Sequence, residues 1–192
     1  MFLAVFTVSI LTAQLEINID TSSSTIKWSG SNLFKFNEHY GTVKFTKGKL
    51  IKKGAHFTGG SFEIDMNSIR NTDGKYNEML VAHLKNEDFF DVQQYPFANL
   101  QITNIRYTHS NTLEVTANLT IKGKTNPITY TAIVTNENHN TQMVSKFIID
   151  RTLWYVNYES KGLLKTLKDD AISDAIIFEV TVTTAQDEYI GQ

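Results

Sequence analysis

The chain has 192 residues, of which 41% are hydrophobic and 20% charged, and its 18 basic and 20 acidic side chains give a net charge of −2. A single domain is expected at this length. The balanced charge argues against a nucleic-acid binder, which needs a concentrated basic surface. Because the chain has no Cys, disulfides, thiolate nucleophiles, iron–sulfur clusters and Cys-ligated zinc are excluded.

Residues 1–13 resemble an export signal. The segment MFLAVFTVSILTA carries no charged side chain, its apolar run is too short to span a bilayer, and the small Ala13 suits a cleavage site. A Lys- or Arg-containing start is missing, as it would be if translation began further upstream. We expect a signal peptide at 1–13, incomplete at its start, and one exported domain at 14–192, periplasmic or otherwise outside the cytoplasm. A buried first strand is the alternative.

Apolar and polar residues alternate with a period of two along most of the remaining chain, which is typical of strands with one buried face. The clearest run alternates Leu113, Val115, Ala117, Leu119 and Ile121 with polar residues. Similar runs separated by turn signals predict eight strands, at about 24–30, 40–52, 55–67, 97–108, 112–122, 125–136, 142–150 and 175–186. Short connections favour antiparallel pairing. Closing the sheet would cover its apolar face, so we expect an all-β, eight-stranded antiparallel barrel, with a two-sheet sandwich as the competitor.

Residues 73–85 break this pattern. Tyr76, Met79, Leu80, His83 and Leu84 recur at helical spacing, which predicts a short helical insertion between strands 3 and 4. Thr72 or Asp73 is the expected N-cap, and Asn86 is expected to cap a second short turn before Pro96 starts the next strand. The form of the long segment 154–174 is not predicted.

Candidate catalytic or metal-binding groups are sparse. No two His residues have a metal-binding spacing, and no phosphate-binding or nucleophile motif occurs. We expect solvated turns at His39, His109 and His139, and a packing role for His83. Gly59-Gly60 predicts a bulge or a close backbone approach, and Arg151 is expected in a structural ion pair or in backbone hydrogen bonds.

Two charged clusters allow weaker interpretations. The acidic residues Asp169, Asp170 and Asp174 are expected in a solvated loop, with a divalent-ion site as the alternative. Lysines surround the first hairpin at positions 44, 47, 49, 52 and 53. They fit a solvated hairpin with protected edges, or a transient contact with anionic lipid headgroups or a phosphate.

Three segments resemble signatures of the YceI-like family. They are His83–Val92 (HLKNEDFFDV) followed by Tyr95-Pro96, Leu119–Thr125 (LTIKGKT) with Pro127, and Ile149–Thr152 (IDRT). The first is specific, and their order is also that of the family. The chain departs from the family pattern at Tyr155, where many members have Gly, and over 161–174.

The resemblance implies an extended, lipocalin-like barrel that binds a polyisoprenoid, a quinone or a similar lipid in the periplasm. Because catalytic and metal-binding motifs are sparse, we expect binding without catalysis and without a metal or cofactor. It leaves the oligomeric state open, a dimer included. Alternation and the helical stripe suggest as ligand-binding residues Trp28, Phe34, Phe36, Phe62, Ile64, Met79, Leu80, Leu84, Leu119, Tyr130, Phe147 and Phe178. A solid structural or stress-response barrel, or a lipid-acting enzyme that uses His83 with Asp88 or Asp91, are the alternatives.

Overall fold

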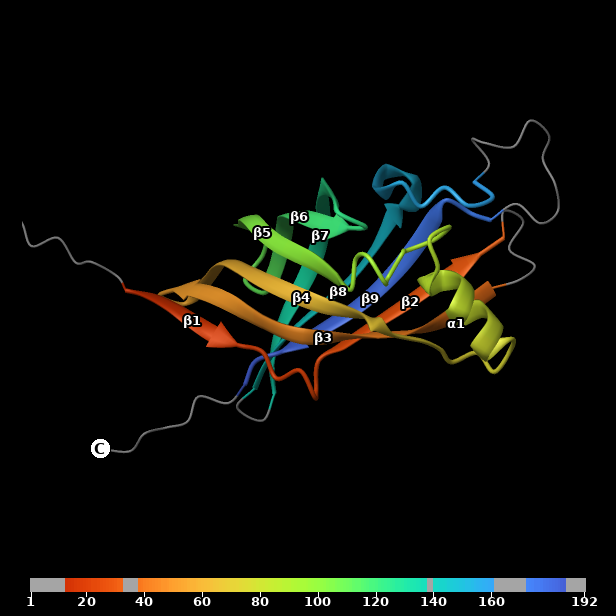
Figure 1. Ribbon diagram of the computed structural model, residues 1–192. Coiled ribbons are helices and arrows are strands. Elements are labelled where there is room, and N and C mark those ends of the chain that lie inside the picture. The colour runs from red at the N-terminus through yellow and green to blue at the C-terminus, as the bar shows by residue number, and fades with distance from the viewer. Residues whose placement is uncertain (1–12, 33–37, 138–139, 161–171, 186–192) are drawn as a thin grey trace, which may run out of the picture.

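The computed structural model describes residues 13–32, 38–137, 140–160 and 172–185. Short turns join most of the strands (Figure 1). In chain order the elements of these residues are β1 (Gln14–Asn18), β2 (Thr25–Ser31), β3 (Glu38–Lys53), β4 (His56–Asn71), α1 (Asn77–Lys85), β5 (Phe97–Tyr107), β6 (Thr112–Ile121), β7 (Lys124–Glu137), β8 (Asn140–Asp150), the 3-10 helix η1 (Arg151–Trp154) and β9 (Ala175–Thr183).

The sheet closes on itself. Strands β3, β2, β9, β8, β7, β6, β5 and β4 are neighbours in that order, every pair is antiparallel, and β3 also pairs with β4. Strands β2–β9 therefore form the predicted eight-stranded antiparallel barrel, in which each strand has a neighbour on both sides. No helix of the described residues is long and apolar enough to cross a bilayer.

The short strand β1 was not predicted, and it changes the numbering of the elements. It pairs with the last residues of β3, whereas β2 pairs with the first residues of the same strand. Between them the chain leaves the sheet in a turn that Asp20 organises, because hydrogen bonds from Ser22 and Ser23 hold the pKa of its carboxyl down at about 2. The helix therefore follows β4, and its predicted place between strands 3 and 4 is wrong.

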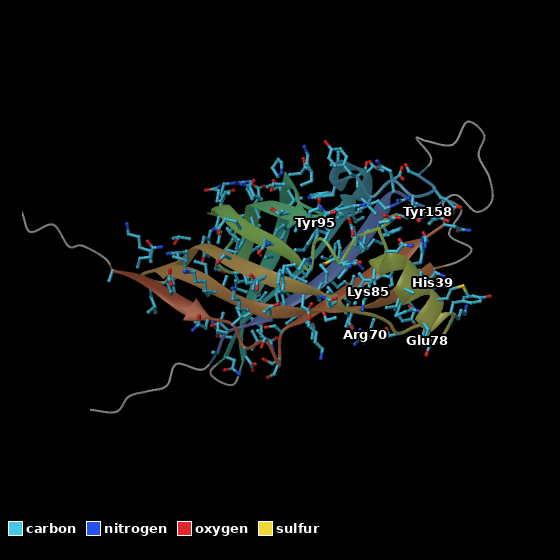
Figure 2. The ribbon with its side chains drawn as sticks, viewed as in Figure 1. His39, Arg70, Glu78, Lys85, Tyr95 and Tyr158 are labelled. Atoms are coloured by element: carbon cyan, nitrogen blue, oxygen red, sulfur yellow. The ribbon has the colours of Figure 1, made fainter. Side chains whose placement is uncertain are left out.

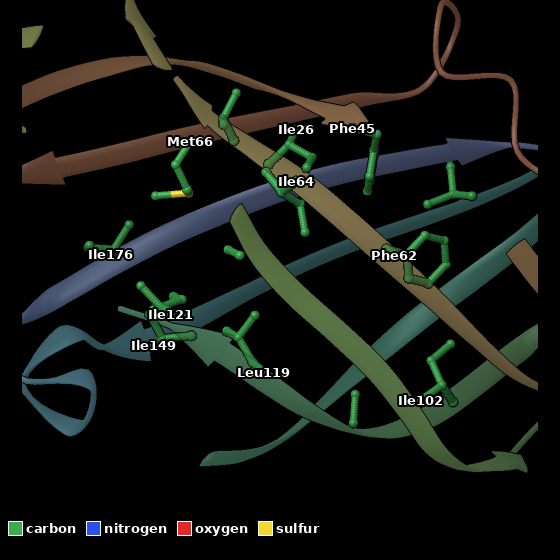
Figure 3. Packing of buried hydrophobic residues seen from close by; sticks show 14 of the residues in the cluster. Ile26, Phe45, Phe62, Ile64, Met66, Ile102, Leu119, Ile121, Ile149 and Ile176 are labelled. Carbon is green, nitrogen blue, oxygen red and sulfur yellow. The ribbon is translucent and has the colours of Figure 1, made fainter. Parts of the chain in front are cut away.

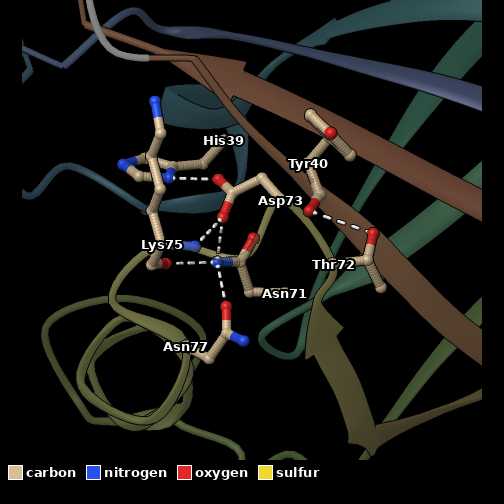
Figure 4. Close-up of polar contacts among 7 residues, drawn as sticks. All are labelled: His39, Tyr40, Asn71, Thr72, Asp73, Lys75 and Asn77. Atoms are coloured by element: carbon tan, nitrogen blue, oxygen red, sulfur yellow. Dashed lines mark hydrogen bonds and ion pairs between the residues drawn. The ribbon is translucent and has the colours of Figure 1, made fainter.

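The start of α1 also differs from the prediction. The helix begins at Asn77 after Tyr76, which has a left-handed φ of 50° and makes no side-chain cap, so neither Thr72 nor Asp73 is the N-cap. The Asp73 carboxylate instead accepts hydrogen bonds from the backbone N–H of Lys75 and the side-chain amide of Asn71, both at 2.7 Å (Figure 4). Asp73 is thus occupied by the turn that precedes the helix.

Inward-facing residues of the strands form the core, as the alternation predicts. On β6, Leu113, Val115 and Ala117 are fully buried, and inward residues from other strands pack around the barrel axis in Figure 3. The predicted irregularity at Gly59-Gly60 is confirmed, since the β3–β4 register shifts beside Gly59 and a Cβ on Gly60 would lie 2.8 Å from the carbonyl oxygen of Lys49.

Candidate functional site

The barrel encloses a cavity of about 350 Å³. Each of the strands β2–β9 contributes to its wall, together with one face of α1, the turn that follows α1, and residues next to η1 and β9. The lining is almost entirely apolar. Such a space is suited to an apolar chain rather than to a charged substrate, because a buried charge needs a partner.

Aromatic side chains form much of the wall between the barrel ends. Tyr130 and Phe147 are stacked with ring centroids 4.8 Å apart, Phe178 lies 5.6 Å from Phe147, and Phe45 lies 5.8 Å from Phe62. Burial raises the pKa of Tyr130, so its hydroxyl stays protonated at neutral pH. These rings offer broad apolar surfaces to a bound chain.

The polar residues of the wall, except Ser145 on β8, lie at the barrel end that carries α1, which we call the helix end. In Figure 2, His39 and Tyr158 mark this end beside the helix. Its residues come from segments far apart in the sequence: Ser31, Asn32, His39, His83, Arg151 and Ser173. The cavity is therefore asymmetric, with an apolar body and one polar end.

Among the described residues of this lining, Arg151 is the only Lys or Arg side chain, and it is 1% exposed. Its guanidinium donates to the carbonyl oxygens of Val156 (2.6 Å), Ser173 (3.1 Å) and Ile172 (3.4 Å), and lies 3.6 Å from the Asp174 carboxylate. Burial lowers the pKa of Arg151, and Asp174 opposes that shift. The predicted structural role is confirmed, because these bonds fasten the segment after η1 to the start of β9.

Asp150 precedes Arg151 in sequence, but its carboxylate is hydrogen-bonded to Thr152 at the start of η1. Its carboxylate accepts from the backbone N–H of Thr152 at 3.0 Å and from the Thr152 hydroxyl at 2.6 Å, which caps η1. The fully buried Trp154 then donates its indole N–H to the carbonyl oxygen of Leu119 at 2.9 Å. Together these bonds hold η1 against β6.

His39 was expected to be solvated, and this expectation is wrong. Its ring lines the cavity, and its Nδ1 lies 2.6 Å from the carboxylate of Asp73, whose side chain is only 4% exposed (Figure 4). Burial alone would raise the pKa of Asp73, but the hydrogen bonds from Lys75, His39 and Asn71 outweigh it and lower the pKa. The pair joins the start of β3 to the turn before α1.

The comparisons with known proteins agree with this architecture. The model of the YceI-like domain matches residues 17–184. The chain belongs to the YceI-like family. Curated relatives include UPF0312 proteins of Pseudomonas putida strains F1 and KT2440, each 26% identical over 129 residues, which are 66% of this chain. The match spans 65% of the length of these relatives.

Solved structures of other proteins share the YceI-like fold. BcnA of Burkholderia cenocepacia has a TM-score of 0.71 at 20% identity, over 87% of this chain and 99% of its own. A polyisoprenoid-binding domain from Saccharophagus degradans, implicated in plant cell wall breakdown, has a TM-score of 0.64 at 14% identity, over 88% and 97% of the two chains. At these identities the likeness concerns the fold alone.

The structure brings most of the suggested ligand-binding residues to one cavity. The wall includes Trp28, Phe62, Ile64, Leu80, Leu84, Leu119, Tyr130, Phe147 and Phe178. Met79 is wrong, because it lies on the outer face of α1 with 69% of its surface exposed, one position away from the inward row formed by Leu80, His83 and Leu84. Phe34 and Phe36 lie outside the described residues.

Several wall residues were not predicted although the same pattern contains them. Met66 follows Ile64 by two positions, Ile121 follows Leu119, and Val180 and Val182 follow Phe178. Continuing each alternation to the end of its strand would have found these residues. The aromatic pair that follows α1, Phe89 and Phe90, also lines the cavity, although neither was among the suggested ligand-binding residues.

Two other predictions concern the rim and the surface of this YceI-like barrel. Tyr155, which stands where many members of the family have Gly, has a left-handed φ of 60°, a conformation that Gly adopts without steric cost. Among the hairpin lysines, Lys47 lies 3.3 Å from Glu63 and Lys49 lies 2.7 Å from Glu16. These pairs are those of an ordinary charged sheet surface, and a contact with lipid headgroups stays a prediction.

Proposed function

We propose that this YceI-like protein binds a long apolar lipid, of the polyisoprenoid or related class, with its chain inside the barrel. The observation that carries the proposal is the cavity of about 350 Å³, which has apolar walls contributed by every strand of the barrel. Its single polar end would accommodate the headgroup of a lipid that has one polar end and an apolar chain. The family membership and the fold shared with a polyisoprenoid-binding domain support the same class of ligand.

Burial of the chain would supply the affinity. Each CH₂ group moved from water into an apolar site contributes roughly 0.8 kcal/mol. Ten such groups contribute on the order of 8 kcal/mol, which corresponds to about micromolar binding before the cost of ordering the chain is subtracted. Longer isoprenoids contribute more, so shape and length of the apolar part set the affinity.

The proposed role is carriage or storage without chemical conversion. The charged and basic groups at the helix end are engaged in structural contacts, as Arg151 is with three carbonyl oxygens and His39 is with Asp73. His83, the candidate base, has its Nδ1 in contact with the side-chain amide of Asn86 rather than with Asp88 or Asp91. We further propose that residues 1–13 direct the protein to the periplasm, where an apolar lipid needs a carrier to cross water.

The experiment is organic extraction of the purified full-length and mature proteins, followed by mass spectrometry. We expect a lipid with a long isoprenoid or comparable chain, chemically unchanged and close to one molecule per barrel. The delipidated protein should then take up prenyl probes in vitro. A protein that is free of lipid as purified and also fails to bind any prenyl probe would contradict the carrier function. N-terminal sequencing of the exported protein tests the signal peptide.

A further inference from the structure

The orientation of His83 on the wall of the cavity has consequences for the lipid headgroup. Its ring projects from α1 and packs edge-to-face on Tyr158, with centroids 4.4 Å apart, and lies 6.0 Å from Phe89. These aromatic contacts hold the plane of the ring. His83 is therefore a positioned side chain at the helix end, and the remaining question is which of its nitrogens carries the proton.

Asn86 answers this question through its own hydrogen bonds. Its Oδ1 accepts the backbone N–H of Asp88 at 3.0 Å, which fixes the direction of the amide group. Its Nδ2 is thereby turned toward Nδ1 of His83, 3.4 Å away. An amide nitrogen can only donate, so Nδ1 must accept. The neutral ring then carries its proton on Nε2.

The resulting N–H donor at Nε2 has no partner among the described residues, although the atom is buried. The same is true of Nε1 of Trp28, an indole nitrogen that can only donate. Both side chains line the same cavity. Buried polar groups of folded proteins are nearly always satisfied, so two donors on this wall that find no partner among the described residues indicate an acceptor that belongs to the ligand.

The charge at the helix end points to the kind of acceptor. The Arg151 guanidinium is already neutralised by Asp174 and donates to three carbonyl oxygens, and His39 already faces the Asp73 carboxylate. An anionic headgroup would thus meet the two neutral N–H donors of Trp28 and His83. Arg151 and His39 would not offer it a free positive charge, because each already faces a carboxylate. An uncharged oxygen acceptor, such as a carbonyl group, can accept from these donors without bringing an unpaired charge into the barrel.

We propose that His83 is a specificity-determining residue whose Nε2–H, together with Trp28, selects lipids with an uncharged carbonyl-type headgroup over lipids with an anionic one. This inference rests on the proposed function, because it assumes that the tail occupies the barrel. It assigns Asn86 a positioning role, since its amide fixes which nitrogen of His83 donates.

The test compares three probes with the same C20 prenyl tail: a methyl ketone, a monophosphate and a hydrocarbon without a headgroup. The delipidated full chain is titrated with each probe in a common detergent. We expect the ketone to bind about tenfold more tightly than the hydrocarbon, as one net hydrogen bond of typical strength allows, and more tightly than the monophosphate. His83→Phe keeps the ring packing and removes the donor, so the ketone should lose its advantage over the hydrocarbon when both are measured on this variant.

His109→Phe is the matched control, because His109 is exposed and does not line the cavity; it should retain the preference for the ketone. The ¹⁵N NMR spectrum of the wild-type His83 ring provides an independent readout that does not need the variant to fold. It should show the Nε2–H tautomer, with a downfield shift of that proton when the ketone binds.

The outcomes separate the two proposals. If none of the three probes binds to the wild-type protein, the lipid-binding function itself is wrong. If the hydrocarbon binds but the monophosphate binds more tightly than the ketone, or His83→Phe keeps the ketone preference, the role of His83 is overturned while lipid binding stands. An Nδ1–H tautomer in the NMR spectrum would also overturn it.

Discussion

Replacing Ala98 by leucine tests directly whether the barrel is hollow. Ala98 lies on β5 opposite Ile64 of β4, is 5% exposed and lines the cavity. Leucine adds three carbon atoms, and at roughly 0.8 kcal/mol for each buried CH₂ the gain is at most about 2 kcal/mol if they enter open space. In a barrel filled by its own side chains the same substitution would overpack the core and cost about 1–3 kcal/mol.

Ala117→Leu is the matched control for this substitution. Ala117 belongs to the same apolar cluster and is fully buried, but it is not part of the cavity wall. Thermal unfolding of the delipidated proteins measures the difference. Since 1 kcal/mol changes Tm by roughly 2–4 °C at this chain length, Ala98→Leu should raise Tm by several degrees and Ala117→Leu should lower it. If both variants lose stability equally, the reasoning from the cavity is refuted.

The size of the cavity explains why its filling should matter. At about 24 cal/mol per Å³, an empty apolar cavity of about 350 Å³ costs on the order of 8 kcal/mol. This is comparable with the whole free energy of unfolding of a typical domain, 5–15 kcal/mol in round numbers. A bound lipid recovers a part of this cost, so delipidation should lower Tm. Ala98→Leu, which occupies part of the space, should both reduce this loss and weaken lipid binding.

Three further substitutions test the supports of the helix end. Arg151→Lys should destabilise the protein by about 3 kcal/mol in urea denaturation, because a lysine cannot satisfy three carbonyl oxygens and Asp174 together; an unchanged midpoint would contradict this. Because the pKa of Asp73 is lowered in the folded protein, its ionised carboxylate stabilises the fold above the unfolded-state pKa. This contribution is lost as the pH falls through the lower folded-state pKa. The free energy of unfolding of Asp73→Asn should therefore decrease less on acidification below about pH 4 than that of the wild type. Tyr155→Gly should raise stability by up to about 1 kcal/mol by relieving the left-handed backbone, and a lower Tm would show that the contact of its ring with Lys124, 5.3 Å away, matters more.

The period-two pattern predicted the barrel because burial on one face is what forms it. The predicted strand 112–122 appears as Thr112–Ile121, and its inward residues are those that alternation selects. β1 was missed because only five residues pair before the Asp20 turn interrupts the strand. The N-cap of α1 was misplaced because Asp73 is a good capping residue by type, whereas its carboxylate is used by Lys75, Asn71 and His39, contacts that depend on tertiary structure.

The apolar part of the candidate site was predictable for the same reason, and its polar end was not. Side chains alternate between the two faces of a strand, so the positions of Phe62 and Leu119 along their strands decide that they face the cavity. This alternation can be recognised in the local sequence. Ser31, His39, His83 and Ser173 meet only after the barrel has closed and β2, β3, α1 and β9 share one end. Helical spacing marked His83, but no short-range signal distinguishes Ser31, His39 and Ser173 from surface residues, which is why His39 was expected to be solvated.

The apolar wall and the polar helix end differ in whether a substitution can change the proposed lipid binding without changing the fold. A residue such as Phe147 stacks on Tyr130 and also lines the cavity, so its substitution changes the fold and the proposed lipid contact at once. His83 differs, because its packing depends on the ring and its proposed recognition depends on one N–H group. A change from His to Phe removes the second and keeps the first. Under the proposed function, the helix end is thus the part of this barrel where substitutions can change selectivity among lipids of equal length while the apolar wall, and with it the fold, stays the same.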